Sequence, residues 1–123
     1  MKSERFLLDT NIFILLFNDR LVENLPLGEI LCSVITEMEL LSFPLLTSAE
    51  ENMIRAKRAN LTVYGIDDTV KEQTIRLRRA IRLKLPDAII AATALTHKAI
   101  LVTNDKALHM IPELDCRSLE LKT

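Results

Sequence analysis

The chain has 123 residues, of which 49% are hydrophobic and 27% charged, and its formal net charge is −1 at pH 7. This length and composition predict one folded domain over residues 1–123 and exclude a disordered chain. The near-neutral charge gives no sign of a globally basic nucleic-acid binder, so such binding must come from a local patch. No apolar segment approaches the roughly 18 residues that a membrane span needs.

The start of the chain and the two cysteines indicate a soluble, cytoplasmic protein. Residues 1–5 lead directly into a strand-length apolar run, without the pattern of a signal peptide. Cys32 and Cys116 each lie in an apolar stretch and lack the spacing of metal ligands. We therefore expect both to be buried, reduced core residues.

Apolar runs and capping residues predict alternating strands and helices in the first half of the chain. Thr36 is the expected N-cap of the second helix, and Ser48 with Glu51 has the spacing of a capping box for the third. Pro44 ends the second helix, because the residue before a proline is pushed out of the α region. Strands are expected at residues 6–8, 30–34 and 61–64, and helices at 12–17, 36–42 and 48–59, with a short helical turn within 18–24.

The second half continues the same alternation. Asp67 or Asp68 is the expected cap of a long amphipathic helix, and Pro86 occupies the first turn of an almost wholly apolar one. These helices are expected at residues 68–81 and 85–95, a short helix from 106, and strands at 100–102 and 115–119. Strands that alternate with helices predict a parallel sheet covered on both faces, so the fold class is a three-layer α/β/α sandwich.

Four acidic residues lie where such a fold places its ligand site. Asp9 and Asp105 each follow an apolar strand, and ligands bind at the carboxyl ends of parallel strands. Asp9 could equally be only a helix cap. Asp87 begins a helix that must be buried, although an acid there also suits the helix dipole. Glu39 follows the second strand, and periodicity alone does not choose between it and Glu37.

Carboxylates gathered at one edge of a sheet repel one another, so they take up protons or bind a cation. Oxygen ligands without a neighbouring histidine or cysteine pair suit Mg²⁺ or Mn²⁺. Thr10, Asn11, Thr103 and Asn104 stand beside these acids and could orient them or hold metal-bound waters.

Two further patterns point to partners. No acidic residue interrupts the chain between Glu72 and Asp87, where Arg78 and Arg82 are four residues apart among other basic residues. This run is either a solvated helix face or a contact for RNA phosphates. An apolar cluster within residues 40–46 is either core or a groove for a partner helix.

Four segments together resemble the PIN domain, and most of all the single-domain toxin ribonucleases of the VapC type. The likeness covers almost the whole chain, in order. Its motifs are Asp-Thr-Asn at 9–11, the helix at 36–41, Leu-Pro-Asp-Ala at the start of 85–94, and Val-Thr-Asn-Asp within 101–105.

The resemblance implies a sheet ordered 3-2-1-4-5 and an Mg²⁺- or Mn²⁺-dependent endoribonuclease. The family's catalytic acids correspond to Asp9, Glu39, Asp87 and Asp105, and Glu39 is preferred to Glu37 because a leucine follows it. The metal ligands implied are Asp9, Asp105 and Asp87, with Thr103 as a hydroxyl beside the site. The partners implied are an RNA substrate, an antitoxin of a type II toxin–antitoxin pair and a second copy of the chain.

Two other functions fit the same residues. One is a non-catalytic binding module with this fold, which would bind RNA or protein. The other is an acid-pocket phosphotransfer protein, but Asn11 occupies the place where the phosphatase pattern needs an acid.

Overall fold

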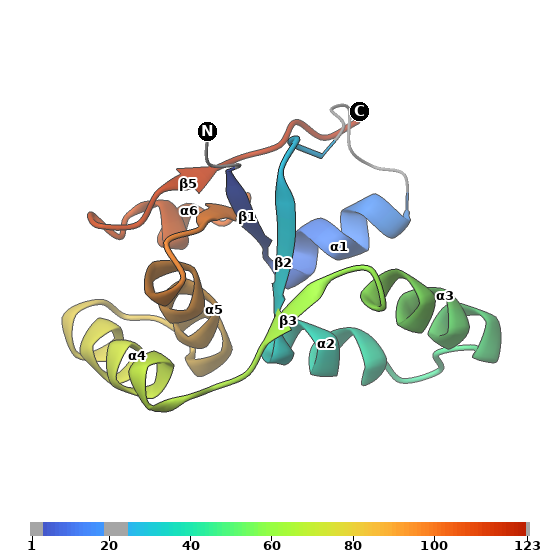
Figure 1. Cartoon of the computed structure of the whole chain (residues 1–123), viewed down its shortest axis with the longest axis horizontal. Helices are drawn as coiled ribbons and strands as arrows, with labels where there is room; N and C mark the ends of the chain where they lie inside the picture. Colours follow the sequence, from blue (N-terminus) through green and yellow to red (C-terminus); the bar gives the residue numbers. More distant parts are fainter. Residues whose placement is uncertain (1–3, 19–24, 123) are drawn as a thin grey trace.

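The computed structural model describes residues 4–18 and 25–122 (Figure 1). Its sheet is parallel, with the strand order β3-β2-β1-β4-β5, which confirms the predicted topology. The strands are β1 (Arg5–Leu8), β2 (Glu29–Ser33), β3 (Thr62–Tyr64), β4 (Ile100–Val102) and β5 (Cys116–Arg117). The helices are α1 (Thr10–Phe17), α2 (Val34–Leu41), α3 (Ser48–Arg58), α4 (Asp68–Ala80), α5 (Leu85–Thr96) and α6 (Lys106–His109).

Helices cover both faces of the sheet, with α4 and α5 on one side and α1 and α3 on the other (Figure 1). Alternate residues of a strand point to opposite faces. Leu7 therefore packs in the cluster with α4 and α5, whereas Phe6 and Leu8 pack in the cluster with α1 and α3. This burial on both faces explains why β1 is a continuous apolar run. No helix among the described residues is long and apolar enough to cross a membrane.

The caps of two helices differ from the prediction. Ser33, not Thr36, caps α2, because β2 runs directly into the helix and the Ser33 hydroxyl accepts a hydrogen bond from Ile35 N. The capping box of α3 is formed by Thr47 and Glu50, one residue earlier than predicted. The helical turn predicted within 18–24 lies, apart from residue 18, outside the described residues.

The other helical predictions fit the structure closely. Asp67, one of the two expected caps, caps α4, which is amphipathic as predicted and buries Val70, Thr74 and Leu77. The helix α5 has Pro86 in its first turn and is buried from residue 88 to residue 94. Of the two free cysteines, Cys32 is buried as predicted but Cys116 is only partly buried.

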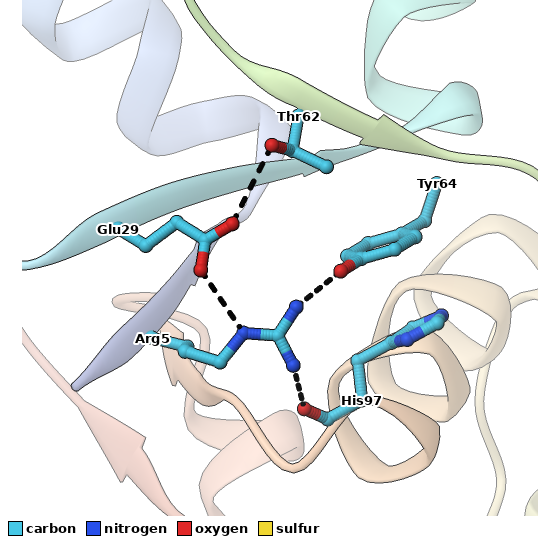
Figure 2. A network of polar contacts seen from close by, with 5 residues as sticks. All are labelled: Arg5, Glu29, Thr62, Tyr64 and His97. Atoms are coloured by element: carbon cyan, nitrogen blue, oxygen red, sulfur yellow. Dashed lines mark hydrogen bonds and ion pairs between the residues drawn. The ribbon is translucent and has the colours of Figure 1, made fainter. Parts of the chain in front are cut away.

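Arg5 ties β1 to three other elements where that strand begins, at its end away from Asp9 (Figure 2). Its Nε lies 3.3 Å from Glu29 Oε2 at the start of β2, and its Nη1 donates to the backbone oxygen of His97 at 2.7 Å. Its Nη2 also donates to the hydroxyl of Tyr64, whose ring stacks on His97 with centroids 3.6 Å apart. One guanidinium thus joins β1 to β2, to β3 and to the C-terminal end of α5.

Replacing Arg5 by Lys should test this junction. Lysine keeps the charge but lacks the planar fork that reaches three acceptors at once. We expect the free energy of unfolding to fall by about 1.5 kcal/mol, from two or more lost charged hydrogen bonds. Urea denaturation measures this change. The control Arg55→Lys disturbs an exposed i,i+4 pair with Glu51 and should cost less than about 0.5 kcal/mol. Equal effects of the two variants would contradict the junction.

Candidate active site

The pairing of β1 with β4 brings two of the predicted acids to one edge of the sheet. Leu8 is in register with Val102, and the backbone nitrogen of Asp9 donates to Val102 O at 3.0 Å. Asp105 follows three residues after Val102, where the neighbouring strand ends. The sheet continues to β2 on one side and β5 on the other, so this edge is the point where strand order reverses.

Asp9 is buried, with only 8% of its surface exposed. One carboxylate oxygen accepts from Asn11 N at 2.6 Å, so Asp9 does cap α1, as one interpretation of the sequence held. The other oxygen accepts from the hydroxyl of Thr103 at 2.5 Å. The Thr103 hydroxyl in turn accepts from Asp105 N at 3.1 Å, which makes it a bridge between the two acids.

The two glutamates of α2 point to different partners. Glu37 forms an ion pair with Arg58 of α3. Glu39 accepts from the Thr10 hydroxyl at 2.7 Å, and the hydroxyls of Thr10 and Thr36 lie 2.9 Å apart. Thr36 is fully buried and was not predicted as a site residue, although its spacing of three from Glu39 places both on one helix face.

All four predicted acids line one cavity of about 620 Å³, together with Asn11 and Asn104. The described residues that line it include no lysine or arginine. The lining is Asp9, Thr10, Asn11, Ile14, Glu39, Ser42, Phe43, Asp87, Ile90, Asn104 and Asp105.

The acids of this cavity disfavour one another's charge. Burial raises the pKa of Asp9 above its usual value, and the charge of Asp105 adds to this rise, while the hydrogen bonds from Thr103 and Asn11 oppose it. Burial also raises the pKa of Asp87, and the charges of Asp105, Asp9 and Glu39 raise it further, while the charge of Lys84, which does not line the cavity, opposes this rise. The cavity therefore holds negative charge that no lining cation neutralises.

Asn104 has a structural contact that the sequence did not reveal. Its amide nitrogen donates to Leu119 O at 2.9 Å, and its amide oxygen accepts from Leu119 N at 2.8 Å. His109 Nε2 lies 2.7 Å from Thr103 O and 3.2 Å from the hydroxyl of Ser118. The C-terminal segment thus holds the turn that carries Asp105.

The predicted basic contacts, Arg78 and Arg82, do not line the acidic cavity. Together with Arg79 they line a separate cavity of about 630 Å³ beside the loop between α4 and α5. Arg76, from the same run, instead forms an ion pair with Glu113 at 2.9 Å.

Comparison with known families identifies the fold. The PIN domain family model matches residues 6–114. This chain belongs to the PIN domain family. The family expected from the sequence is thereby confirmed. Among curated protein sequences no match reaches significance.

Solved structures agree with this assignment. A chain of a toxin–antitoxin complex from Klebsiella pneumoniae is 34% identical, with a TM-score of 0.76, over 88% of this chain and 93% of that one. VapBC2 from Rickettsia felis, bound to a promoter DNA fragment, is 20% identical with a TM-score of 0.78, over 94% and 99%. DNA-bound VapBC from Salmonella typhimurium is 21% identical with the same TM-score, over 94% and 98%. The last two share the fold of this PIN domain.

The donors in this cavity have the chemistry of a hard divalent cation site. They are carboxylate, hydroxyl and amide oxygens, which Mg²⁺ and Mn²⁺ prefer. Within residues 4–18 and 25–122, no three acidic, histidine or cysteine side chains lie close enough to form a metal-binding cluster. The ligand set of Asp9, Asp87 and Asp105 therefore stays a prediction for this PIN domain.

Asp87→Asn should reveal the repulsion among these acids when divalent ions are removed with EDTA. A carboxyl whose pKa is raised by folding destabilises the fold as pH rises through that pKa, because the folded state binds more protons. The asparagine side chain cannot ionise, so the melting temperature of the variant relative to wild type should be higher at pH 7 than at pH 4. Thermal denaturation followed by circular dichroism measures both differences.

The matched control is Asp68→Asn, in the first turn of α4 and outside the cavity. Both substitutions remove an acid from a helix N-terminus, so their dipole effects are comparable. A melting difference for Asp87→Asn that does not change between the two pH values would contradict the repulsion.

Proposed function

We propose that this PIN domain is an Mg²⁺- or Mn²⁺-dependent endoribonuclease that hydrolyses RNA phosphodiester bonds. The observation that carries the proposal is the convergence of Asp9, Glu39, Asp87 and Asp105 on one cavity without a lining cation. These acids come from two strand ends and two helices, which is an arrangement that a merely solvated set of charges does not need. The volume of the cavity, about 620 Å³, is within the range of ligand pockets.

The residues of the cavity have distinct roles in this reaction. Asp9, Asp105 and Asp87 would hold the ion directly or through its bound waters, of which Mg²⁺ keeps several. The bound ion would polarise a phosphoryl oxygen and lower the pKa of a bound water. Asn11 N and Thr103 fix the Asp9 carboxylate, so its orientation does not have to be set at the moment of reaction.

Glu39 would orient the attacking water and accept its proton in this reaction. The hydroxyl of Thr10 holds the Glu39 carboxylate at 2.7 Å, and Thr36 supports Thr10 from the buried side. These hydrogen bonds restrict the orientation of the Glu39 carboxylate, as a positioned general base requires.

Cleavage of end-labelled RNA with and without Mg²⁺ tests the reaction. Asp9→Asn and Asp105→Asn should each lower the cleavage rate by on the order of 100-fold or more, as expected for lost electrostatic stabilisation. Asparagine retains the oxygen that accepts from Asn11 N or Ala107 N, so the caps of α1 and α6 survive. Circular dichroism confirms that each variant is folded.

A matched pair within α2 sharpens this test. Glu39→Gln should lose activity, whereas Glu37→Gln should keep it, because Glu37 pairs with Arg58 away from the cavity. Wild-type rates in folded Asp9→Asn and Asp105→Asn would contradict the nuclease. An inactive wild type that still binds RNA would instead favour the non-catalytic module.

An antitoxin partner belongs to the same proposal, and an apolar groove beside the cavity supports it. The groove has a volume of about 380 Å³, and Ile14 and Phe43 line both it and the acidic cavity. Leu45 in its wall is 97% exposed with a φ of 66°, an unfavourable backbone for leucine. The matched Klebsiella chain also comes from a toxin–antitoxin complex. We therefore propose a type II toxin, with an apolar antitoxin helix covering the site.

A homodimer and a cytoplasmic location complete the proposal. The dimer is implied by the family resemblance, whereas the cytoplasmic location is the one expected from the two cysteines and the start of the sequence. Sedimentation of the purified chain tests the dimer directly.

A further inference from the structure

The cavity beside the α4–α5 loop combines three arginines with an apolar floor. Arg78 and Arg79 come from the last turn of α4, and Arg82 comes from the loop. Ile75 and Leu85, which are 42% and 49% exposed, supply apolar surface in the same cavity. No acidic side chain of the described residues lines it, so its charge is strongly positive.

The arginines of this run differ in what already occupies them. Arg76 lies outside the cavity and is used by Glu113 and Gln73. The Nε of Arg78 donates to Leu83 O at 3.3 Å, and this hydrogen bond fixes the loop between α4 and α5. Within the described residues, Arg79 and Arg82 have no ion pair with an acid. Their planar forks are therefore available to an anion, and such forks match a phosphate with two parallel hydrogen bonds.

The position of this cavity relates it to the acidic one. Leu85 lines the basic cavity and Asp87 lines the acidic cavity, and both belong to the first turn of α5. Residues two positions apart on a helix are separated by about 200° of rotation about its axis. The two cavities therefore lie on opposite sides of that turn. An RNA strand that crosses the start of α5 would enter both.

We propose that the basic cavity binds a nucleotide of the RNA substrate across the first turn of α5 from the cleaved bond, with Arg79 and Arg82 on its phosphate and its base against Ile75 and Leu85. This inference rests on the proposed function, because it deepens the description of the same substrate. Phosphate contacts supply most nucleic-acid affinity, and bases of unpaired RNA bind apolar surfaces and guanidinium planes. It follows that RNA too short to cross α5 is a poorer substrate.

The test is RNA binding at several salt concentrations, measured by fluorescence anisotropy in EDTA so that no cleavage occurs. The double variant Arg79→Gln/Arg82→Gln should bind a labelled single-stranded RNA more weakly. The slope of log affinity against log salt should become shallower by about 1.4, which is roughly 0.7 for each of two lost contacts. Glutamine keeps a helix propensity similar to that of arginine.

The control Arg55→Gln/Arg76→Gln also removes two positive charges, but outside the cavity, where both arginines pair with glutamates. Its salt slope should stay that of wild type. A second variant, Leu85→Ala, should weaken binding without changing the slope, since it removes only apolar contact.

Two results would overturn the inference. One is a folded Arg79→Gln/Arg82→Gln variant with the affinity and slope of wild type. The other is a double variant that differs from wild type in oligomeric state by sedimentation but keeps the wild-type salt slope. That result would assign this surface to a protein interface. A shallower slope in a protein that never cleaves RNA with Mg²⁺ would support the nucleotide site and refute the nuclease, so the two failures are distinguishable.

Discussion

The burial of the Asp9 carboxylate at the shared end of β1 and β4 is the constraint on which the site depends. A buried carboxylate is costly unless hydrogen bonds or a cation compensate it. Asn11 N and Thr103 provide hydrogen bonds, yet the pKa of Asp9 is still raised, first by burial and then by Asp105. The parallel pairing of β1 with β4 imposes this proximity, since the carboxyl ends of neighbouring parallel strands lie side by side. The fold thus creates a charge that a divalent cation would neutralise.

Hydroxyl groups fix the carboxylates around this constraint. Thr103 bridges Asp9 and Asp105, and Thr10 joins Glu39 to the buried Thr36. Farther out, the C-terminal segment holds the β4–α6 turn, and the Arg5 guanidinium locks the opposite ends of β1, β2 and α5 (Figure 2). Asp9 and Asp87 therefore stand on elements whose far ends the Arg5 guanidinium holds, and Asp105 follows a turn that the C-terminal segment holds, as a preorganised site requires.

The sequence was most informative where one local signal had no competitor, as in the strand at 100–102 and the proline in the first turn of α5. The order of the sheet was also predicted correctly, but from the family resemblance. The cap of α2 was not predicted correctly, because β2 runs directly into the helix at Ser33. The cap of α3 was not, because Thr47 and Ser48 are both good caps and each has a glutamate three residues later. Local rules cannot choose between such equivalents.

Distant contacts decided the remaining choices. The sequence alone did not choose between Glu37 and Glu39, and the choice of Glu39 came from the family resemblance. The structure gives the physical reason, because Arg58 of α3 forms an ion pair with Glu37. Arg76 does not line the basic cavity, because its guanidinium binds Glu113, 37 residues away.

The central claim is that the acidic cavity binds a hard divalent cation. It is tested by the melting temperature in millimolar Mg²⁺ or Mn²⁺, against KCl of equal ionic strength. Mass action should raise the melting temperature of wild type. The bound ion adds about 2.7 kcal/mol to the free energy of unfolding when its concentration is 100 times the dissociation constant. The rise should shrink in folded Asp9→Asn/Asp105→Asn, and an equal rise in both proteins, or none in wild type, would contradict the metal site.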